Sequence, residues 1–312
     1  MPKLLIVLLF FGLSSCLQTQ SVEQITGKTM GTSYTIKTQG KADQGLIDQR
    51  LKQINQIFSS WDQHSELSKV NQHPVGQPVR LSAELSKVLS ESVQISIQTQ
   101  GFFDPALGSL IDVWGFGVTK VAQKPGRNKV ARALENALIT KATLKADQLT
   151  KQANIKLNLS AIVKGYAVDE IARLLDQQGV ERFMIEIGGE VKVKGQWTIG
   201  IETPTGQAPI AIDLMNESIA TSGNYRQYFV WEGERYAHIL DPHTGLPVNS
   251  DLFSVSVIHP SNLLADAYAT AMMAMGSVKA QQLAEKLKLK AVLILKSAHD
   301  GNHAENIIKL GL

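Results

Sequence analysis

Two oxygen-bearing side chains near the C-terminus have a spacing that could hold a metal ion. Asp266 and Thr270 lie four residues apart in the segment LLADAYATAMMAMG, which we predict to be helical. Residues at i and i+4 share one face of a helix, so the carboxylate and the hydroxyl converge. Oxygen donors suit a hard cation such as magnesium, which typically takes one or two carboxylates together with water and substrate phosphates. The same pair is also typical of a solvated surface or a helix N-cap.

A second candidate is the stretch LNLSAIVKGYAVD (157–169), followed after one helix by the glycine turn IEIGGE (185–190). We expect an apolar strand that runs into a polar loop, a helix that begins around Ala161, and a second strand that leads to Gly188 and Gly189. Backbone N–H groups at a helix N-terminus and in a glycine turn can approach a phosphate or ribityl group closely. Such units occur in many α/β proteins, so this spacing alone does not assign a cofactor.

Other catalytic patterns have less support. The turn TSGN (221–224) could hold a nucleophilic serine, but His238, the nearest histidine in the sequence, has no triad context. A polar turn before a strand is the simpler interpretation. His238 is itself expected on a strand, where a lone histidine is usually structural. The sequence has no G-x-G-x-x-G, Walker loop, H-E-x-x-H or G-x-S-x-G, which removes support for dinucleotide-fold, P-loop, zincin and α/β-hydrolase chemistry.

The N-terminus has the pattern of an export signal. Lys3 precedes an apolar run from Leu4 to Phe11, which is shorter than the roughly 20 residues of a membrane-spanning helix. We therefore predict a signal peptide over residues 1–15. The small residues before Cys16 resemble a bacterial lipobox, in which that cysteine is lipidated. The alternative is a signal peptide with an incidental cysteine.

The anchor prediction agrees with the cysteine count. Cys16 is the only cysteine in the chain, so no intrachain disulfide can form. We expect residues 16–21 to be a lipidated tether and residues 22–312 to be the folded domain. Leu17 stands where an aspartate would resemble an inner-membrane retention signal, which favours an outer-membrane anchor facing the periplasm.

The composition is that of an ordinary globular protein. The 312 residues are 44% hydrophobic and 19% charged, and the small net charge of +3 comes from scattered lysines and arginines. This distribution gives no indication of a nucleic-acid-binding surface.

The elements that must position the candidate residues are mixed without strict βαβ order, which predicts an α+β fold. A hairpin is expected over residues 24–37, with its bend near Met30 and Gly31, and a helix whose apolar residues run from Ile47 to Phe58. The remaining expected helices begin near Ser82, around Ala161, near Leu263 and near Val278, and the remaining expected strands cover residues 182–187, 197–202, 210–214, 225–231, 253–258 and 291–295.

Eight motifs, in order along nearly all of the chain after the tether, resemble the ApbE family, the FAD:protein FMN transferases, many of which are periplasmic lipoproteins. They are GKTMGTSY from Gly27, SSWDQHSELSKVN from Ser59, FFDPALGSLIDVWGFG from Phe102, LSAIVKGYAVD from Leu159, IEIGGE from Ile185, ATSGNYRQYF from Ala220, AHILDPHTGLPV from Ala237 and ADAYATAM from Ala265. The resemblance implies an ApbE-like fold of mixed sheets with packed helices in two intimately associated subdomains.

The resemblance also implies site residues. FAD would be bordered by Met30, Trp61, Phe102, Phe103, Asp104, Asn158, Lys164 and Leu240. Mg²⁺ would take the backbone carbonyl of Ala161 and the side chains of Asp266 and Thr270. Three positions depart from the common family pattern: Trp61 stands where tyrosine is frequent, Asn158 where aspartate is common, and Ala269 where some members have a second aspartate.

The implied reaction is magnesium-dependent transfer of FMN from FAD to a threonine or serine hydroxyl of another protein, with release of AMP. We assign the base near that hydroxyl to His238, with Asp266 as a metal-engaged competitor. The alternatives are an FAD pyrophosphatase that uses water and a non-catalytic FAD-binding lipoprotein. The resemblance points to acceptors in membrane redox complexes, such as a sodium-pumping quinone reductase, that carry a flavinylation motif.

Overall fold

The computed structural model describes residues 22–204, 206, 208–225, 227–296 and 306–312. The predicted signal peptide, the predicted lipidation site Cys16 and the tether lie outside these residues. Within them, no helix is both long enough and apolar enough to cross a bilayer.

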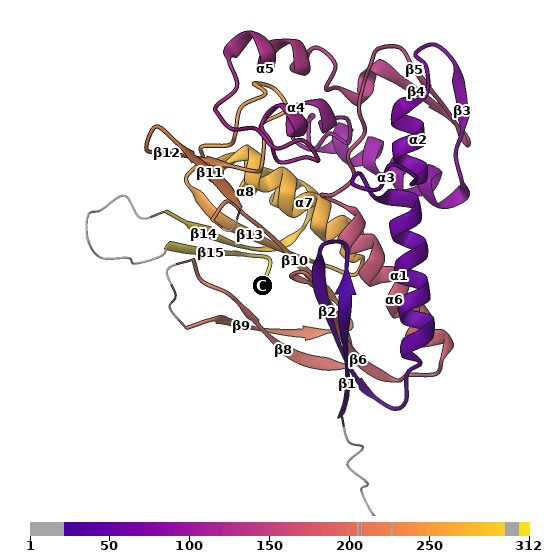
Figure 1. The fold of residues 1–312 in the computed structure, drawn as a ribbon. Helices are drawn as coiled ribbons and strands as arrows, with labels where there is room; N and C mark the ends of the chain where they lie inside the picture. Colours follow the sequence, from indigo (N-terminus) through magenta and orange to yellow (C-terminus); the bar gives the residue numbers. More distant parts are fainter. Residues whose placement is uncertain (1–21, 205, 207, 226, 297–305) are drawn as a thin grey trace, which may run out of the picture.

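An antiparallel sheet of eight strands forms the centre of the molecule, in the order β1-β2-β6-β7-β10-β13-β14-β15 (Figure 1). Its strands are β1 (Val22–Thr29), β2 (Thr32–Gln39), β6 (Arg182–Ile187), β7 (Glu190–Lys194), β10 (Ser218–Gly223), β13 (Leu252–His259), β14 (Lys290–Leu295) and β15 (Asn306–Leu310). Two-residue turns join β1 to β2 and β6 to β7, so both turns lie at the same end of neighbouring hairpins.

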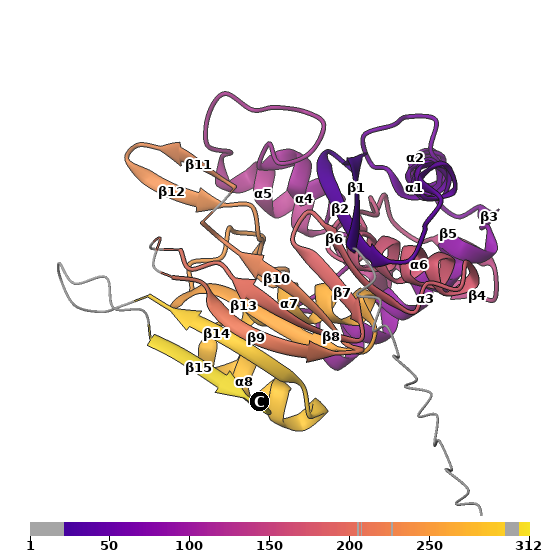
Figure 2. The ribbon, with the colours of Figure 1, turned by 90° about the horizontal axis from the view of Figure 1, so that it is seen from below.

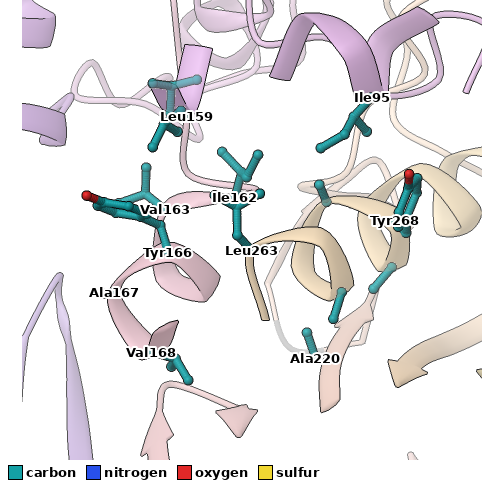
Figure 3. Packing of buried hydrophobic residues seen from close by; sticks show 14 of the residues in the cluster. Ile95, Leu159, Ile162, Val163, Tyr166, Ala167, Val168, Ala220, Leu263 and Tyr268 are labelled. Atoms are coloured by element: carbon teal, nitrogen blue, oxygen red, sulfur yellow. The ribbon is translucent and has the colours of Figure 1, made fainter. Parts of the chain in front are cut away.

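Helices cover one face of this sheet. They are α6 (Val163–Gln177), α7 (Asn262–Met275) and α8 (Ser277–Leu287), with α1 (Gln44–Phe58) and α3 (Ala83–Gln98) packed outside them. Figure 3 shows Ile162 near the start of α6 close to Leu263 at the start of α7, and both belong to the main apolar core. The crossing of α6 and α7 is therefore fixed by close packing.

A two-stranded ribbon covers the other face of the sheet. It consists of β8 (Gln196–Ile201) and β9 (Ile210–Met215), seen in front of the sheet in Figure 2. Ile201 and Leu214 of the ribbon pack against Val193 of β7 in a second apolar cluster. The central strands of the sheet are thus covered on both faces, whereas the edge strands β1 and β15 remain largely exposed.

A smaller part of the molecule lies beyond one end of the helices (Figure 1). Its elements are α2 (Glu66–Gln72), α4 (Gly108–Val113), α5 (Arg127–Leu134), the 3₁₀ turn η1 (Ile139–Lys141), the sheet β3-β5-β4 (Pro78–Arg80, Gln148–Lys151, Ala142–Lys145) and the hairpin β11-β12 (Tyr228–Trp231, Glu234–Ala237). Trp114 stacks on Tyr236 and donates its indole N–H to the Gly245 carbonyl at 2.8 Å, which ties α4 to the hairpin side.

The α+β class is confirmed, as are the hairpin with its bend at Met30 and Gly31 and the expected helices. The strand expected before α6 is wrong. Leu157 bonds the side chain of Asn71 through both its N–H and its carbonyl, and Asn158 donates its N–H to the Pro105 carbonyl, so neither residue pairs with a strand.

Two further expectations need correction. Residues 221–223 continue β10, where Thr221 faces Ser256 of β13, so the polar turn predicted there is wrong. The hydroxyls of these two residues bond each other at 2.7 Å, which explains how a polar sequence fits inside a sheet. His238, expected on a strand, lies immediately after the end of β12.

Candidate active site

One cavity of about 1220 Å³ lies between the glycine-turn end of the sheet, the start of α6 and the smaller part of the molecule. All the FAD-binding, metal-binding and catalytic residues predicted from the sequence line it: Met30, Trp61, Phe102, Phe103, Asp104, Asn158, Ala161, Lys164, His238, Leu240, Asp266 and Thr270. Pockets for drug-sized ligands usually measure about 300–1,000 Å³, so this one suits a larger molecule. The structure brings the residues together; their individual roles stay predictions.

Asp266 belongs to α7, but its side chain lies against the N-terminus of α6. Its side chain is buried, and Oδ2 accepts the backbone N–H of Gly165 at 3.1 Å. Gly165 lies in the first turn of α6, where backbone N–H groups have no acceptor within the helix. Ala161 precedes the N-cap Ile162, and its carbonyl accepts no backbone N–H within the described residues, so it is available at the wall of the cavity.

The approach of α7 to α6 depends on Gly165. A β-carbon at this position would lie 2.3 Å from the backbone oxygen of Asn262, which is shorter than any real contact. Asp169, one turn further along α6, accepts the N–H groups of Asn262 and Leu263 at 3.0 and 3.1 Å and the Ser261 hydroxyl at 2.8 Å. The motif VKGYAVD thus places the start of α7, and with it Asp266.

Thr270 lies one turn after Asp266, as the i, i+4 spacing predicts. Its hydroxyl bonds the Ser222 hydroxyl of β10 at 2.9 Å, and both residues line the cavity. The pair is not a solvated surface, because the face of α7 that carries it packs on the sheet.

Lys164 lies between two buried carboxylates. Its Nζ donates to Glu190 Oε1 at 2.5 Å. Burial opposes the charge on Lys164, but Glu190 and Asp266 outweigh it and raise the pKa of the ammonium. Burial raises the pKa of Asp266 and that of Glu190 above their usual ranges, although Lys164 acts in the opposite direction on both.

Two bonds to one carbonyl orient His238. Both its backbone N–H and its ring Nδ1 lie 3.2 Å from the backbone oxygen of Gln227. A carbonyl can only accept, so Nδ1 carries the proton and Nε2 keeps its lone pair. Burial lowers the pKa of His238, and the charge of Lys164 adds to the shift. The neutral ring is therefore able to take a proton near neutral pH.

The residues assigned to the flavin nucleotide differ in exposure. Trp61 is 59% exposed, with the Lys120 ammonium 5.3 Å from its ring centre. Phe103 and Leu240 are buried among apolar neighbours, so they shape the wall. Met30 has a positive φ of 49°, a conformation that costs a non-glycine residue roughly 1–2 kcal/mol.

Two polar residues of the wall are engaged in local structure. Asp104 accepts the N–H groups of Ala106 and Ile139 at 2.8 and 3.1 Å, and burial raises its pKa to about 6. Asn158 accepts the N–H and the hydroxyl of Ser160 through Oδ1 at 3.0 and 2.7 Å. Asn158 can then offer a ligand its amide N–H groups, which an aspartate would lack.

The donor set beside Asp266 fits magnesium. Among the described residues, no three side chains of the types His, Cys, Asp and Glu form a group that could hold a metal ion. A cation here would use one carboxylate, the Ala161 carbonyl and the Thr270 hydroxyl, with its other positions left for water and phosphate oxygens. Magnesium prefers such an incomplete set of oxygen donors.

Sequence reasoning missed the residues that support those it found. Glu190 contacts Lys164, Ser222 contacts Thr270, and the Gln227 carbonyl holds His238. Glu190 directly follows the glycine turn, and Ser222 belongs to the segment considered for a nucleophile, so a signal existed for both. Gln227 acts through its backbone carbonyl, which every residue type has, so the sequence gives no signal for this role.

Comparison with known proteins agrees with this geometry. A model of the ApbE family matches residues 30–293. The chain belongs to the ApbE family. A relative from Haemophilus influenzae, named FAD:protein FMN transferase, is 35% identical, with 93% of this chain and 91% of that protein covered. A relative of the same name from Vibrio cholerae is 34% identical over 91% of both.

Solved ApbE structures have the same fold. The flavin transferase ApbE from Vibrio cholerae superposes with a TM-score of 0.84 at 33% identity, covering 93% of this chain and 98% of that one. The flavinyl transferase ApbE from Pseudomonas stutzeri, in its apo form, gives 0.84 at 30% identity, with 93% and 95% covered. The resemblance of the eight motifs to the ApbE family is thereby confirmed.

Proposed function

We propose that this ApbE-family enzyme transfers the FMN part of FAD to a threonine or serine hydroxyl of an acceptor protein and releases AMP. The new bond joins the acceptor oxygen to the phosphorus of FMN, and the bond that breaks joins that phosphorus to the AMP oxygen. The hydroxyl proton leaves to a base. The relatives named FAD:protein FMN transferase support the substrate and the kind of acceptor.

The observation that carries the proposal is the convergence of groups around Asp266. Lys164 from α6, Thr270 from α7 and His238 from the segment after β12 line the same cavity as this buried carboxylate. A protein that only bound flavin would have no need for a cation donor, an ammonium and a neutral histidine in one wall. Cleavage of a pyrophosphate can use all three, to activate the acceptor and to stabilise the developing charge.

Magnesium is the cation we propose, held by the Ala161 carbonyl, Asp266 and Thr270. When bound, it supplies a Lewis acid for the pyrophosphate oxygens. The ammonium of Lys164 would contact the phosphate groups and balance the charge that develops during transfer.

His238 is the base that we propose for the acceptor hydroxyl. The Gln227 carbonyl fixes the proton on Nδ1, so Nε2 is the atom that takes the new proton. The lowered pKa of His238 keeps this atom free of protons at neutral pH. Asp266 is less suited, because its oxygens are committed to Gly165 and to the proposed cation.

The aromatic wall would hold the flavin nucleotide. Trp61 and Phe102 offer flat surfaces on which an isoalloxazine or adenine ring can stack. Asn158 would donate its amide N–H to the cofactor.

We also propose that the protein acts at the cell envelope. The lipobox pattern at Cys16 supports a lipid anchor, with the domain facing the periplasm and the outer membrane favoured. Acceptors would then be periplasmic flavin domains of membrane redox complexes.

One incubation tests the reaction. The mature protein is mixed with FAD, Mg²⁺ and an acceptor that has an exposed Asp-Gly-x-x-Thr/Ser-like sequence, and flavin fluorescence of the acceptor is read in a denaturing gel. A fluorescent acceptor band is expected, and an acceptor whose threonine is replaced by valine is the control. Free FMN and AMP without labelled acceptor would make the protein a pyrophosphatase, and intact FAD would make it a binder.

A further inference from the structure

Glu190 is a deeply buried ion-pair partner of Lys164, which lines the cavity. It is the first residue of β7, directly after the Gly188–Gly189 turn, and its side chain is 2% exposed. Lys164, which it contacts, keeps 32% exposure on the cavity side. Both residues line the cavity, and the carboxylate is much the more buried of the two.

Burial of this carboxylate is costly, and folding alone gives little reason for it. A buried ion pair is often no more stable than apolar residues of the same volume. The second oxygen of Glu190 is buried with no hydrogen-bond partner among the described residues. Polar groups kept in such an environment are concentrated at functional sites.

A second pair in the same chain provides a comparison. Lys290 and Glu217 also form a 2.7 Å ion pair, but their side chains are 42% and 23% exposed and they line no part of the cavity. Exposed pairs of this kind contribute little to stability. The Glu190 pair differs from it in both burial and position.

A lysine needs such support if it is to act at a defined point. Its ammonium is a point charge on a flexible four-carbon stem. Asp266 also attracts Lys164, so without Glu190 the ammonium would be drawn toward the proposed cation site. Glu190, directly after the glycine turn, instead holds it in a direct ion pair at 2.5 Å.

We infer that Glu190 is a positioning residue, which holds the Lys164 ammonium at the place where it meets the FAD pyrophosphate and away from Asp266. This inference rests on the proposed function. It does not make Glu190 a ligand of FAD. Loss of Glu190 should therefore change the rate of transfer more than the binding of FAD, because a displaced ammonium still attracts the anion.

The test uses the mature protein with Glu190→Gln, which keeps the shape but loses the charge, and Glu190→Asp, which keeps the charge on a shorter side chain. We expect kcat for FMN transfer to fall about 10- to 100-fold in both variants. The Kd for FAD, measured by flavin fluorescence, should stay within about threefold, since binding depends less on the ammonium position than transfer does. The matched control, Glu217→Gln, should behave as wild type.

A double variant separates positioning from an independent role. In Lys164→Met the ammonium is absent, so adding Glu190→Gln should cause no further loss of kcat. Losses that multiply would overturn the inference. So would parallel loss of kcat, FAD affinity and melting temperature in Glu190→Gln, which would mark a structural residue.

A readout without substrate completes the test. In protein labelled with ¹⁵N-lysine, a held ammonium gives an observable NH₃⁺ resonance, which is assigned by its absence in Lys164→Met. This resonance should broaden or vanish in Glu190→Gln, and its persistence unchanged would contradict positioning. If the wild-type protein transferred no FMN, the proposed function would be wrong. The spectroscopic result would still decide whether Glu190 holds the Lys164 ammonium, because it needs no substrate.

Discussion

The backbone N–H of Gly165 donates to Asp266 Oδ2 at 3.1 Å, which joins two motifs that are 101 residues apart in the sequence. The bond places a carboxylate at the N-terminus of α6, where the helix dipole favours negative charge. The Ala161 carbonyl lies just before this helix. One hydrogen bond therefore brings together both halves of the proposed cation site.

Asp266→Asn should abolish most of the activity without loss of fold. The amide oxygen can still accept the Gly165 N–H, but the charge that attracts the cation is gone. Several kcal/mol of transition-state stabilisation depend on such a cation, so we expect a rate at least about 100-fold lower. The melting temperature of the apo protein should not fall, because a buried carboxylate is replaced by a neutral group.

The measurement is FMN transfer together with melting temperature at increasing Mg²⁺. Wild type should gain thermal stability from the metal, and Asp266→Asn should gain none. Full activity of the variant in a chelating buffer would refute the metal assignment.

Gly165→Ala should destabilise the protein and impair the site at once. The new methyl group would overlap the Asn262 backbone, and overpacking of this kind costs about 1–3 kcal/mol. We expect a lower midpoint in urea and weaker magnesium binding, because α7 must move away from α6. The control is Gly126→Ala, where a β-carbon meets nothing within 4 Å and φ is −68°. Equal behaviour of the two variants would show that the helix contact is not critical.

The rate of transfer should fall at low pH, where His238 becomes protonated and can no longer accept a proton. The folded pKa of His238 is below its usual value, so the neutral, proton-accepting ring persists as pH falls below 6.5 and is lost only at lower pH. The measurement is kcat/KM for transfer across pH. His238→Ala should be at least about 100-fold slower and lack that fall in rate at low pH. A variant with the wild-type rate at every pH would rule out His238 as the base.

Asp104 should make the apo protein less stable as pH rises from about 4 to about 6. Its pKa is raised from 3.8 to about 6, so the folded state binds the proton more tightly than the unfolded state, and stability falls through this window. The full effect is about 3 kcal/mol, at about 1.4 kcal/mol for each pKa unit. Urea unfolding of wild type and Asp104→Asn at several pH values measures it. The slope of the variant should be shallower by the Asp104 contribution, while Asp266 and Glu190, whose pKa values are also raised, keep theirs. An unchanged slope would assign it entirely to other groups.

The sequence predicted the local parts of the site well. The Asp266 and Thr270 spacing follows from helix periodicity, and the bend at Met30 follows from the turn pattern of a hairpin. Both depend on a few neighbouring residues.

The remaining features depend on contacts across the chain. No local pattern indicates that Asn71 replaces a strand as the partner of Leu157, or that Gln227 reaches His238. The polar residues of β10 resemble a turn until the hydroxyl of Ser256 is found opposite Thr221. The family resemblance supplied the list of site residues, but not the bonds that hold them.

The first turn of helix α6 places Lys164 at the cavity and bonds Asp266 through Gly165, and Asp169, a turn later, places the start of α7. Any shift of this helix would thus change the phosphate contact and the cation donors together. A substitution that shifts α6 is therefore expected to affect both the phosphate contact and the cation donors. Trp61 lies in an exposed loop at the rim of the cavity, outside α6. Substitutions there could change whether water or a protein hydroxyl is the acceptor without moving the phosphate contact or the cation donors.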